Sequence, residues 1–248
     1  SEAAGSSSYH SLQVTARRRF TQSVQFGLSW TWSKAMDYSD FDTTGVSVQV
    51  PVRVWNYGLA AFDRTHIVKI DWLWNLPKVP VQSRIARYAL HDWQLSGITS
   101  FISGSPLGIG YSTTNSLDVT GSATQGARVV VLGDPVLPKG DRTFYKNFRT
   151  EMFARPAVGT VGNAATTQIR GPGVNNFDLS LFKDFPLRES MKLQFRAEAY
   201  NAFNHTQFSG LDTTARFDAS GNQVNTNFGA FTAARSPRIM QFALRFYF

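Results

Sequence analysis

Apolar and polar residues alternate with a period of two along several segments of this chain, which is the pattern of a β-strand with one apolar face. The clearest segment is 24–33, where Val, Phe, Leu and two Trp residues alternate with Gln, Gly, Ser and Thr. The final segment, 240–248, alternates in the same way up to the last residue. Termini are usually polar and frayed, so an apolar terminal strand is unusual.

The same pattern predicts seven strands in all, at 9–20, 24–33, 66–76, 93–103, 176–185, 191–203 and 240–248. A turn of about two residues, near Thr21 and Gln22, separates the first two, which indicates a β-hairpin. Pro77 and Pro80 end the third strand, because proline cannot donate to a β-ladder. A turn at 186–189 joins the fifth and sixth strands.

The predicted connections alternate between short and long. Those joining the first to the second, third to fourth and fifth to sixth strands are short, whereas the segments 34–65, 104–175 and 204–235 are long. Outer-membrane barrels alternate in this way, with short periplasmic turns and long extracellular loops. The strands are also longer than the soluble mode of about 5–6 residues. We therefore expect an all-β fold, a segment of an antiparallel transmembrane β-barrel with seven strands, or eight if the segment 129–132 adds one.

The two strand faces differ in the way that such a barrel requires. The apolar face would meet lipid, and Trp30, Trp32, Trp72 and Trp74 near the strand ends would form an aromatic girdle. The opposite face carries polar residues expected to face the lumen, namely Lys69, Asp71, Lys192, Arg196 and Glu198. A soluble sandwich shows the same alternation, so facing alone leaves that alternative open.

The amino-acid composition limits the kinds of functional site that this chain can form. The 248 residues contain no cysteine, which excludes disulfides, thiolate catalysis and zinc–thiolate sites. The net charge of +8 is compatible with nucleic-acid binding. The densest basic run, 17–19, lies at a strand end and no second cluster supports it, so no nucleic acid is expected. The four His residues are scattered, and no catalytic set, metal site or cofactor is predicted. An acidic group of Asp37, Asp40 and Asp42 fits a solvated loop better than a calcium site.

Two segments carry a family resemblance. The sequences NFDLSLFKDF at 176–185 and LQFRAEAYNAFNHTQF at 193–208 resemble the C-terminal part of a TonB-dependent outer-membrane receptor of the Oar-like group. The segments 9–33, 133–135 and 170–173 and the terminal Phe248 fit the same group. The resemblance implies a barrel of about 22 strands with an N-terminal plug. Residues 1–248 would then be the last third of that barrel, without the plug or the TonB box.

That resemblance implies a transport role in the bacterial outer membrane. The chain would supply barrel wall and ligand-facing loops for a nutrient such as an oligosaccharide or a siderophore. Its partners would be membrane lipid, the missing plug and N-terminal strands, the TonB system through that plug, and the barrel-assembly machinery. That machinery would recognise the terminal strand by its apolar residues Met240, Phe242, Leu244, Phe246 and Phe248.

Other readings stay open at this point. The chain could be a self-contained small outer-membrane barrel with an adhesive or structural role, or a soluble all-β carbohydrate-binding module. The loop aromatics Tyr38, Phe41, Tyr145 and Phe217 are candidates for stacking on a ligand. The sequence does not identify the ligand, and it predicts no enzyme.

Overall fold

The computed structural model describes residues 5–19, 23–39, 50–116, 119–122, 126–188 and 190–248. The long strands are β1 (Ser8–Arg19), β2 (Val24–Asp37), β4 (His66–Asn75), β5 (Trp93–Ile102), β11 (Val174–Arg188), β12 (Met191–Tyr200) and β16 (Ile239–Tyr247). The short strands are β3 (Gly58–Leu59), β6 (Pro106–Leu107), β7 (Gly110–Thr113), β8 (Val130–Val131), β9 (Phe153–Ala154), β10 (Ile169–Arg170), β13 (Phe208–Leu211), β14 (Thr214–Phe217) and β15 (Phe231–Ala234). The helices are α1 (Val52–Asn56), α2 (Arg84–Leu90) and two 3-10 turns at Lys139–Asp141 and Thr150–Met152.

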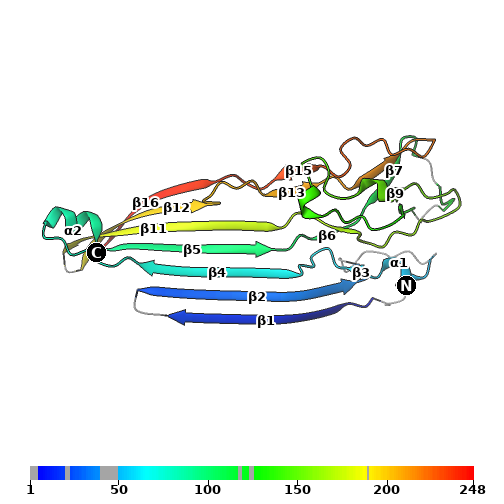
Figure 1. Cartoon of the computed structure of the whole chain (residues 1–248). Helices are drawn as coiled ribbons and strands as arrows, with labels where there is room; N and C mark the ends of the chain where they lie inside the picture. The colour runs from blue at the N-terminus through cyan, green and yellow to red at the C-terminus, as the bar shows by residue number, and fades with distance from the viewer. Residues whose placement is uncertain (1–4, 20–22, 40–49, 117–118, 123–125, 189) are drawn as a thin grey trace.

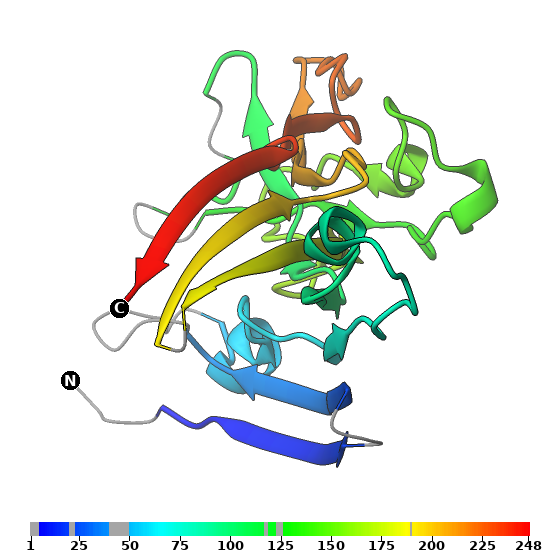
Figure 2. The same cartoon turned by 90° about the vertical axis from the view of Figure 1, so that its left-hand side faces the viewer.

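The seven long strands form one antiparallel sheet in the order β1-β2-β4-β5-β11-β12-β16, with β3 added beside β2 (Figure 1). All seven strands predicted from the alternation are confirmed. Viewed along the strands, the sheet is curved, with β1 and β16 at opposite margins (Figure 2). The sheet is an open sector of a barrel, because β1 and β16 do not pair with each other.

Register carries the alternation of each strand across the whole sheet. Directly opposite residues share a face, and the pairing aligns Val14, Trp30, Val68 and Phe101 in one row. Two residues closer to the turns, a second row on the same face aligns Ala16, Leu28, Ile70, Thr99 and Phe177. The row between these two points to the opposite face and holds Thr15, Ser29, Lys69, Ser100 and Asn176. We call the two sides the apolar face and the polar face.

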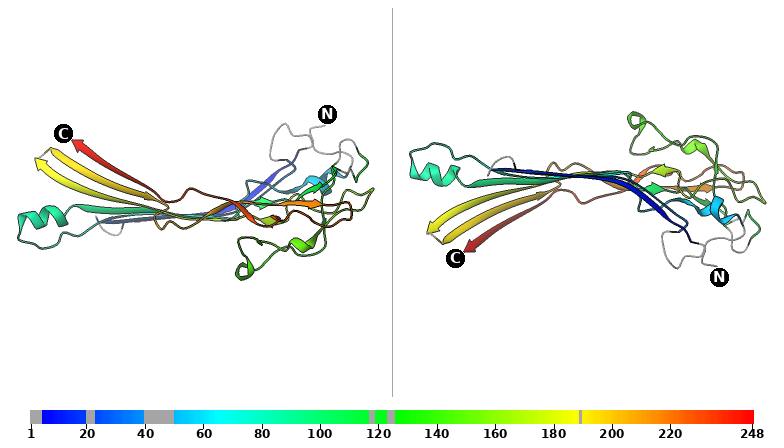
Figure 3. Two further views of the ribbon diagram at one scale, coloured as in Figure 1. Left: turned by 90° about the horizontal axis from the view of Figure 1, so that it is seen from above. Right: turned by 90° about the horizontal axis from the view of Figure 1, so that it is seen from below.

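All long connections emerge at one end of the sheet, the loop end, and the other three connections lie at the opposite turn end (Figure 3). One of these three contradicts the prediction of a short link. The segment between β4 and β5 contains the helix α2, whose first turn is capped by the Ser83 hydroxyl accepting from the Ala86 amide at 3.4 Å.

Two predicted strand ends are wrong for identifiable reasons. The turn expected at 186–189 begins later, because β11 continues to Arg188 through a register shift between Pro186 and Arg188. The strand expected to reach residue 203 stops at Tyr200, because Asn201 adopts a left-handed φ of 50°. The Asn201 side chain bonds both the carbonyl and the amide of His205, at 3.0 and 3.1 Å, and so closes a turn.

The long connections 104–175 and 204–235 fold together into one unit, which we call the loop cap. β7 in the first pairs in parallel with β14 in the second. Phe148, Phe153 and Phe228 pack edge to face, with ring centroids 5.1–5.9 Å apart, in the core of the cap. Burial of these rings supplies the hydrophobic stabilisation that a free loop lacks.

The loop cap also accounts for two other expectations. The candidate eighth strand does not join the main sheet, because Val130 and Val131 pair with Phe153 and Ala154 inside the cap. Phe217, expected to be a ligand-stacking aromatic, is only 1% exposed and belongs to the core of the cap.

Candidate functional site

A recess of about 840 Å³ lies on the polar face at the loop end of the sheet. Its wall comes from β4, β5 and β11, through Lys69, Ser100 and Asn176, and its rim comes from the segments 207–211 and 235–237. The recess is therefore bounded by both the sheet and the loop cap. We call it the mouth recess.

Gln207 attaches the rim to the wall. Its side-chain amide donates to Asn176 Oδ1 at 3.0 Å, and its carbonyl oxygen accepts from the Asn175 amide at 3.2 Å. Asn176 in turn donates to Asp178 Oδ1 at 2.8 Å, and that same oxygen accepts from the Asn201 amide at 2.9 Å. Because Gln207 is buried and bonded on both sides, the rim is held at a fixed position over β11.

The mouth recess carries an excess of positive charge. Lys69, Arg64 and Arg235 line it together with one carboxylate, Asp178. Among the described residues, the Lys69 ammonium and the Arg235 guanidinium make no hydrogen bond or ion pair. These two cations can therefore bind anionic or hydroxyl-rich groups without first breaking an internal contact.

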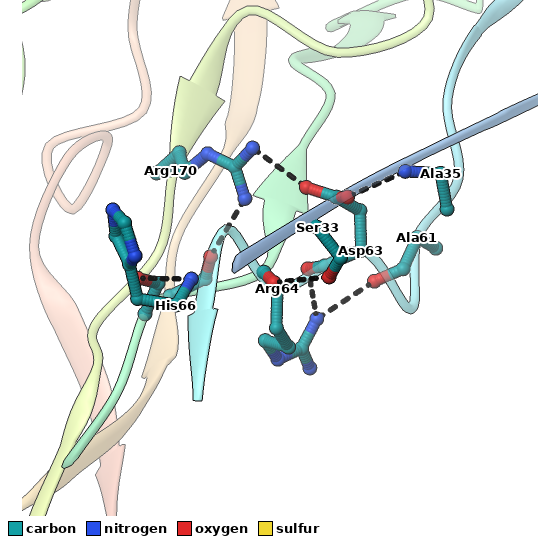
Figure 4. Close-up of polar contacts among 9 residues, drawn as sticks. Ser33, Ala35, Ala61, Asp63, Arg64, His66 and Arg170 are labelled. Atoms are coloured by element: carbon teal, nitrogen blue, oxygen red, sulfur yellow. Dashed lines mark hydrogen bonds and ion pairs between the residues drawn. The ribbon is translucent and has the colours of Figure 1, made fainter. Parts of the chain in front are cut away.

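A buried ion pair joins the loops beside the mouth recess (Figure 4). Arg170 Nη2 lies 2.7 Å from Asp63 Oδ2, and the Asp63 side chain is only 1% exposed. The other Asp63 oxygen accepts from the Ala35 amide at 2.8 Å, and Arg170 Nη1 donates to the Gly104 carbonyl at 3.1 Å. The pair thus links the end of β2, the segment before β4 and both arms of the loop between β5 and β11.

The residues around Asp63 hold Arg64 toward the mouth recess. Arg64 Nη1 donates to the carbonyls of Asp63 and Ala61, at 2.7 and 3.2 Å, and the Arg64 carbonyl accepts from the Ser33 hydroxyl at 3.0 Å (Figure 4). The adjoining His66 amide donates to the Ser103 hydroxyl at 3.1 Å. This segment is therefore fixed to both neighbouring strands.

A second contact between loops involves Arg128 in the cap. Its guanidinium stacks 4.2 Å from the Trp55 ring of α1 and donates to the Trp55 and Ala164 carbonyls. Burial lowers the pKa of Arg128 from its ordinary value, but arginine stays protonated at neutral pH. Together with the Asp63–Arg170 pair and the β7–β14 pairing, this contact joins all three long connections into one unit.

The structure places all five predicted lumen residues on the polar face but separates their roles. Lys69 lines the mouth recess, and Asp71 and Glu198 lie further toward the turns. Lys192 Nζ pairs with Asp184 at 2.8 Å, and Arg196 bonds Gln194 at 2.6 Å and the Tyr247 hydroxyl at 3.0 Å. Lys192 and Arg196 are thus parts of a polar network within the wall.

The four predicted girdle residues lie on the apolar face in two groups. Trp74 pairs with Val24, and Trp32 lies eight residues further along β2. At about 3.3 Å per residue, these two side chains are about 26 Å apart along the strand. This separation matches the roughly 25 Å apolar band that aromatic girdles flank in membrane barrels. Trp30 and Trp72 lie inside the same band.

The terminal strand exposes its apolar face completely. Met240, Phe242, Leu244 and Phe246 all have exposed side chains, and Phe248 follows the end of β16 with 94% of its surface exposed. Its ring stacks near that of Phe246, with centroids 6.0 Å apart. Recognition by the assembly machinery stays a prediction.

The acidic loop group lies mostly outside the described residues. Asp37 ends β2, and Asp40, Phe41 and Asp42 fall in a stretch that is not described. In the described part of the chain, no group of three or more His, Asp or Glu side chains is arranged to hold a metal ion. Nor does any helix there have the length and apolarity needed to cross a membrane.

Sequence reasoning did not identify Asp63, Gln207 or Arg235 as site residues. Arg170 and Gln207 lie in segments that carried the family resemblance, and this was the signal available for them. Asp63 and Gln207 are single polar residues in long connections, and their roles depend on partners 107 and 31 residues away.

Comparison with known proteins gives one match. A family model described as an outer membrane beta barrel domain matches residues 1–241. The curated proteins and the solved structures gave no match. The curved antiparallel sheet, its apolar face with two Trp groups and the family match over nearly the whole length agree, and the chain belongs to the outer membrane beta barrel domain family, whose members lie in the bacterial outer membrane.

Proposed function

We propose that this chain forms a sector of the wall and mouth of an outer-membrane transporter of the TonB-dependent receptor type. The main support for this proposal is the mouth recess. Its volume of about 840 Å³ falls within the roughly 300–1,000 Å³ typical of ligand sites. It opens on the polar face at the loop end, which is the extracellular end of an outer-membrane barrel.

The open sheet supports a larger barrel. Within the described part of the chain, β1 and β16 each have one edge without a partner strand in the main sheet. In lipid, every strand edge must pair, because unpaired amides and carbonyls there cost several kcal/mol each. We therefore propose that further strands of the same receptor close the barrel. Its plug, outside residues 1–248, would connect to the TonB system.

The lining of the mouth recess favours a ligand that is rich in oxygen atoms. Ser100, Asn176 and Ser209 offer hydroxyl and amide groups, while Lys69 and Arg235 offer unpaired positive charge. Oligosaccharides and siderophores both present such oxygens. The proposal gives the chain a binding role and no catalytic one.

Growth on single limiting nutrients tests this function. A strain lacking the gene would be supplied with one ferric siderophore or one oligosaccharide at a time, and we expect at least one of them to fail to support growth. The native gene should restore growth, and Lys69→Met/Arg235→Met should not. The matched control Lys139→Met/Arg216→Met removes two exposed cations of the loop cap and should restore growth.

Energy coupling is tested separately. Deleting the TonB gene of the same host should reproduce the nutrient defect. If no nutrient depends on the gene, the transport proposal is wrong and a self-contained barrel with an adhesive or structural role becomes the better explanation. The soluble carbohydrate-binding alternative is already incompatible with membership of an outer-membrane family.

A further inference from the structure

The link between β4 and β5 at the turn end is a folded element, held by contacts to the strands on either side. The Trp93 indole donates to the Ala89 carbonyl at 2.8 Å, and the Tyr88 hydroxyl donates to the Pro186 carbonyl at 2.9 Å. A ring nitrogen of His91 lies 2.8 Å from the Val79 carbonyl. A helix as short as α2 is marginal by itself in water, so these contacts fix its position.

Lys183 shows which side of the sheet this link covers. Lys183 pairs with Trp93 in the register, on the apolar face, yet its side chain is buried. Its ammonium donates to the carbonyls of His91 and Asp184 and lies 4.8 Å from the Phe185 ring. The link after α2 therefore packs against the apolar face at the boundary of the membrane band, where Trp74 also lies.

The exposed surface of this link is both apolar and basic. Ile85 is 83% exposed, and Val79, Leu90 and the nearby Leu187 of β11 are also exposed. On the α2 helix, Ile85, Ala86 and Ala89 fall on one side, and Arg84 and Arg87 on the other. Exposed apolar residues beside long basic side chains are the pattern of a helix that lies in a membrane interface.

Charge along the strands points to the same place. A single row of the sheet runs through Asn75, Gln94, Phe182, Arg196 and Ala243. From this row to the turns, the segments 75–94, 182–196 and 243–248 hold eight Lys and Arg residues against three Asp and Glu, a net charge of +5. Not all of these cations lie on the exposed surface of the link, because Lys183 is buried and Lys192 and Arg196 belong to the polar network of the wall. The exposed cations of the link are Arg84 and Arg87, beside Lys78, which pairs with Asp92 at 3.5 Å.

We infer that α2 and its flanking link form a docking surface for the anionic phosphate headgroups of the inner leaflet of the outer membrane. Ile85 and Leu90 enter the boundary between headgroups and acyl chains. Arg84 and Arg87 extend along the lipid surface to the phosphates, as long basic side chains do at interfaces. This inference rests on the outer-membrane family and the turn-end geometry, and it does not depend on the transport proposal.

The absence of cysteine makes a direct test possible. The protein at its natural length, carrying Ile85→Cys as its single cysteine, is labelled with an environment-sensitive fluorophore and inserted into phosphatidylcholine vesicles with or without phosphatidylglycerol. We expect blue-shifted emission and quenching by brominated lipid, both stronger with phosphatidylglycerol. A probe at Tyr145→Cys, in the loop cap at the opposite end and 75% exposed, should report water in both vesicles.

The charge requirement is tested with Arg84→Gln/Arg87→Gln in the labelled chain. The gain in lipid contact that phosphatidylglycerol gives the probe should fall roughly 25-fold, since each of the two basic residues near an anionic surface contributes about a five-fold change. Lys139→Gln/Arg216→Gln removes the same charge from the loop cap and should leave this gain unchanged. Quenching of the tryptophans by brominated lipid confirms that each variant has inserted.

Two results would overturn the inference. If the Ile85 probe reports water in inserted protein, the surface faces the periplasm and an acidic protein becomes the better partner. If the probe is shifted equally in both vesicles and the arginine replacements change nothing, phosphate recognition is excluded. Should the arginine variant fail to insert, the apolar half of the contact is tested with Ile85→Asp and the probe moved to Leu90→Cys. Unchanged emission from that probe would contradict the inference.

Discussion

Single residues at the loop end decide whether three separate connections behave as one site. The carboxylate of Asp63 is buried against Arg170 of a different connection, and its second oxygen accepts from the Ala35 amide of β2. A buried carboxylate that loses its partner is strongly destabilising, because its desolvation is no longer compensated. The Asp63–Arg170 pair therefore connects the stability of the loops to the geometry of the mouth recess.

Replacing Arg170 by Ala should release this connection. We expect the free energy of local opening to fall by about 2 kcal/mol. This is less than the cost of breaking a fully buried pair, because the Arg170 side chain is 35% exposed. Hydrogen exchange at the Ala35 amide would measure it. Lys146→Ala, which removes the exposed Lys146–Glu151 pair at 3.1 Å, should change exchange by less than about 1 kcal/mol. Equal exchange in the two variants would contradict the structural role of the buried pair.

Gly104 is a second critical residue of the same site. A Cβ at this position would lie 1.8 Å from the Gly171 carbonyl oxygen, where the two arms of the loop cross. Gly104→Ala should force the arms apart and destabilise the loop end by about 2 kcal/mol, measured by urea unfolding. Gly126→Ala, with no atom within 4 Å, is the control. A stability unchanged by Gly104→Ala would show that the loop arms do not need to touch.

At the scale of elements, the strand pattern determines which surface meets lipid. The apolar rows run from β2 to β4 and from β11 through β12 to β16, and Leu95 and Phe101 of β5 lie between them on the same face. Like β1, the terminal strand β16 has an edge that has no partner strand among the described residues of the main sheet, and Phe248 extends beyond its end.

Deletion of Phe248 tests a role in membrane assembly independently of the stability of the folded sheet. Its side chain is 94% exposed, so its deletion should cost the folded sheet little. If the assembly machinery recognises the terminal aromatic, the amount of protein in the outer-membrane fraction should fall several-fold, measured by quantitative immunoblot. Deletion of the exposed Gly140 in the loop cap is the control. An unchanged outer-membrane yield would exclude the assembly role.

At the scale of the whole molecule, the two ends of the sheet have different characters. The loop end is a folded cap with its own aromatic core, and the turn end is basic and carries a short helix. An outer-membrane barrel places its long loops outside the cell, so the cap should face the medium and α2 should lie on the periplasmic side of the membrane.

Labelling of intact cells checks this orientation. A membrane-impermeant maleimide should modify Tyr145→Cys in the loop cap and leave Leu187→Cys at the turn end unmodified until the outer membrane is opened. Both native side chains are exposed, so burial does not explain a difference between them. Labelling of Leu187→Cys in intact cells would reverse the assigned orientation.

The sequence alone determined the seven strands and their faces, and it favoured an outer-membrane barrel over a soluble all-β module. These follow from local alternation, because a strand with a period of two shows its buried and exposed faces in the order of its residues. It did not show that residues 104–175 and 204–235 fold together. Their apolar residues have no regular spacing, and β7 finds its partner β14 about a hundred residues away.

Only the tertiary structure brought Lys69 and Arg235 together in the mouth recess, with Gln207 bonded to Asn176 at its edge. It paired Asp63 with Arg170 beside the recess. It also showed that the basic residues near the turns form one end of the molecule, which a linear count of charges does not show. The physical reason is the same in each case. Periodicity records which way a residue points from its own strand, whereas a site depends on contacts between segments that are distant in the chain.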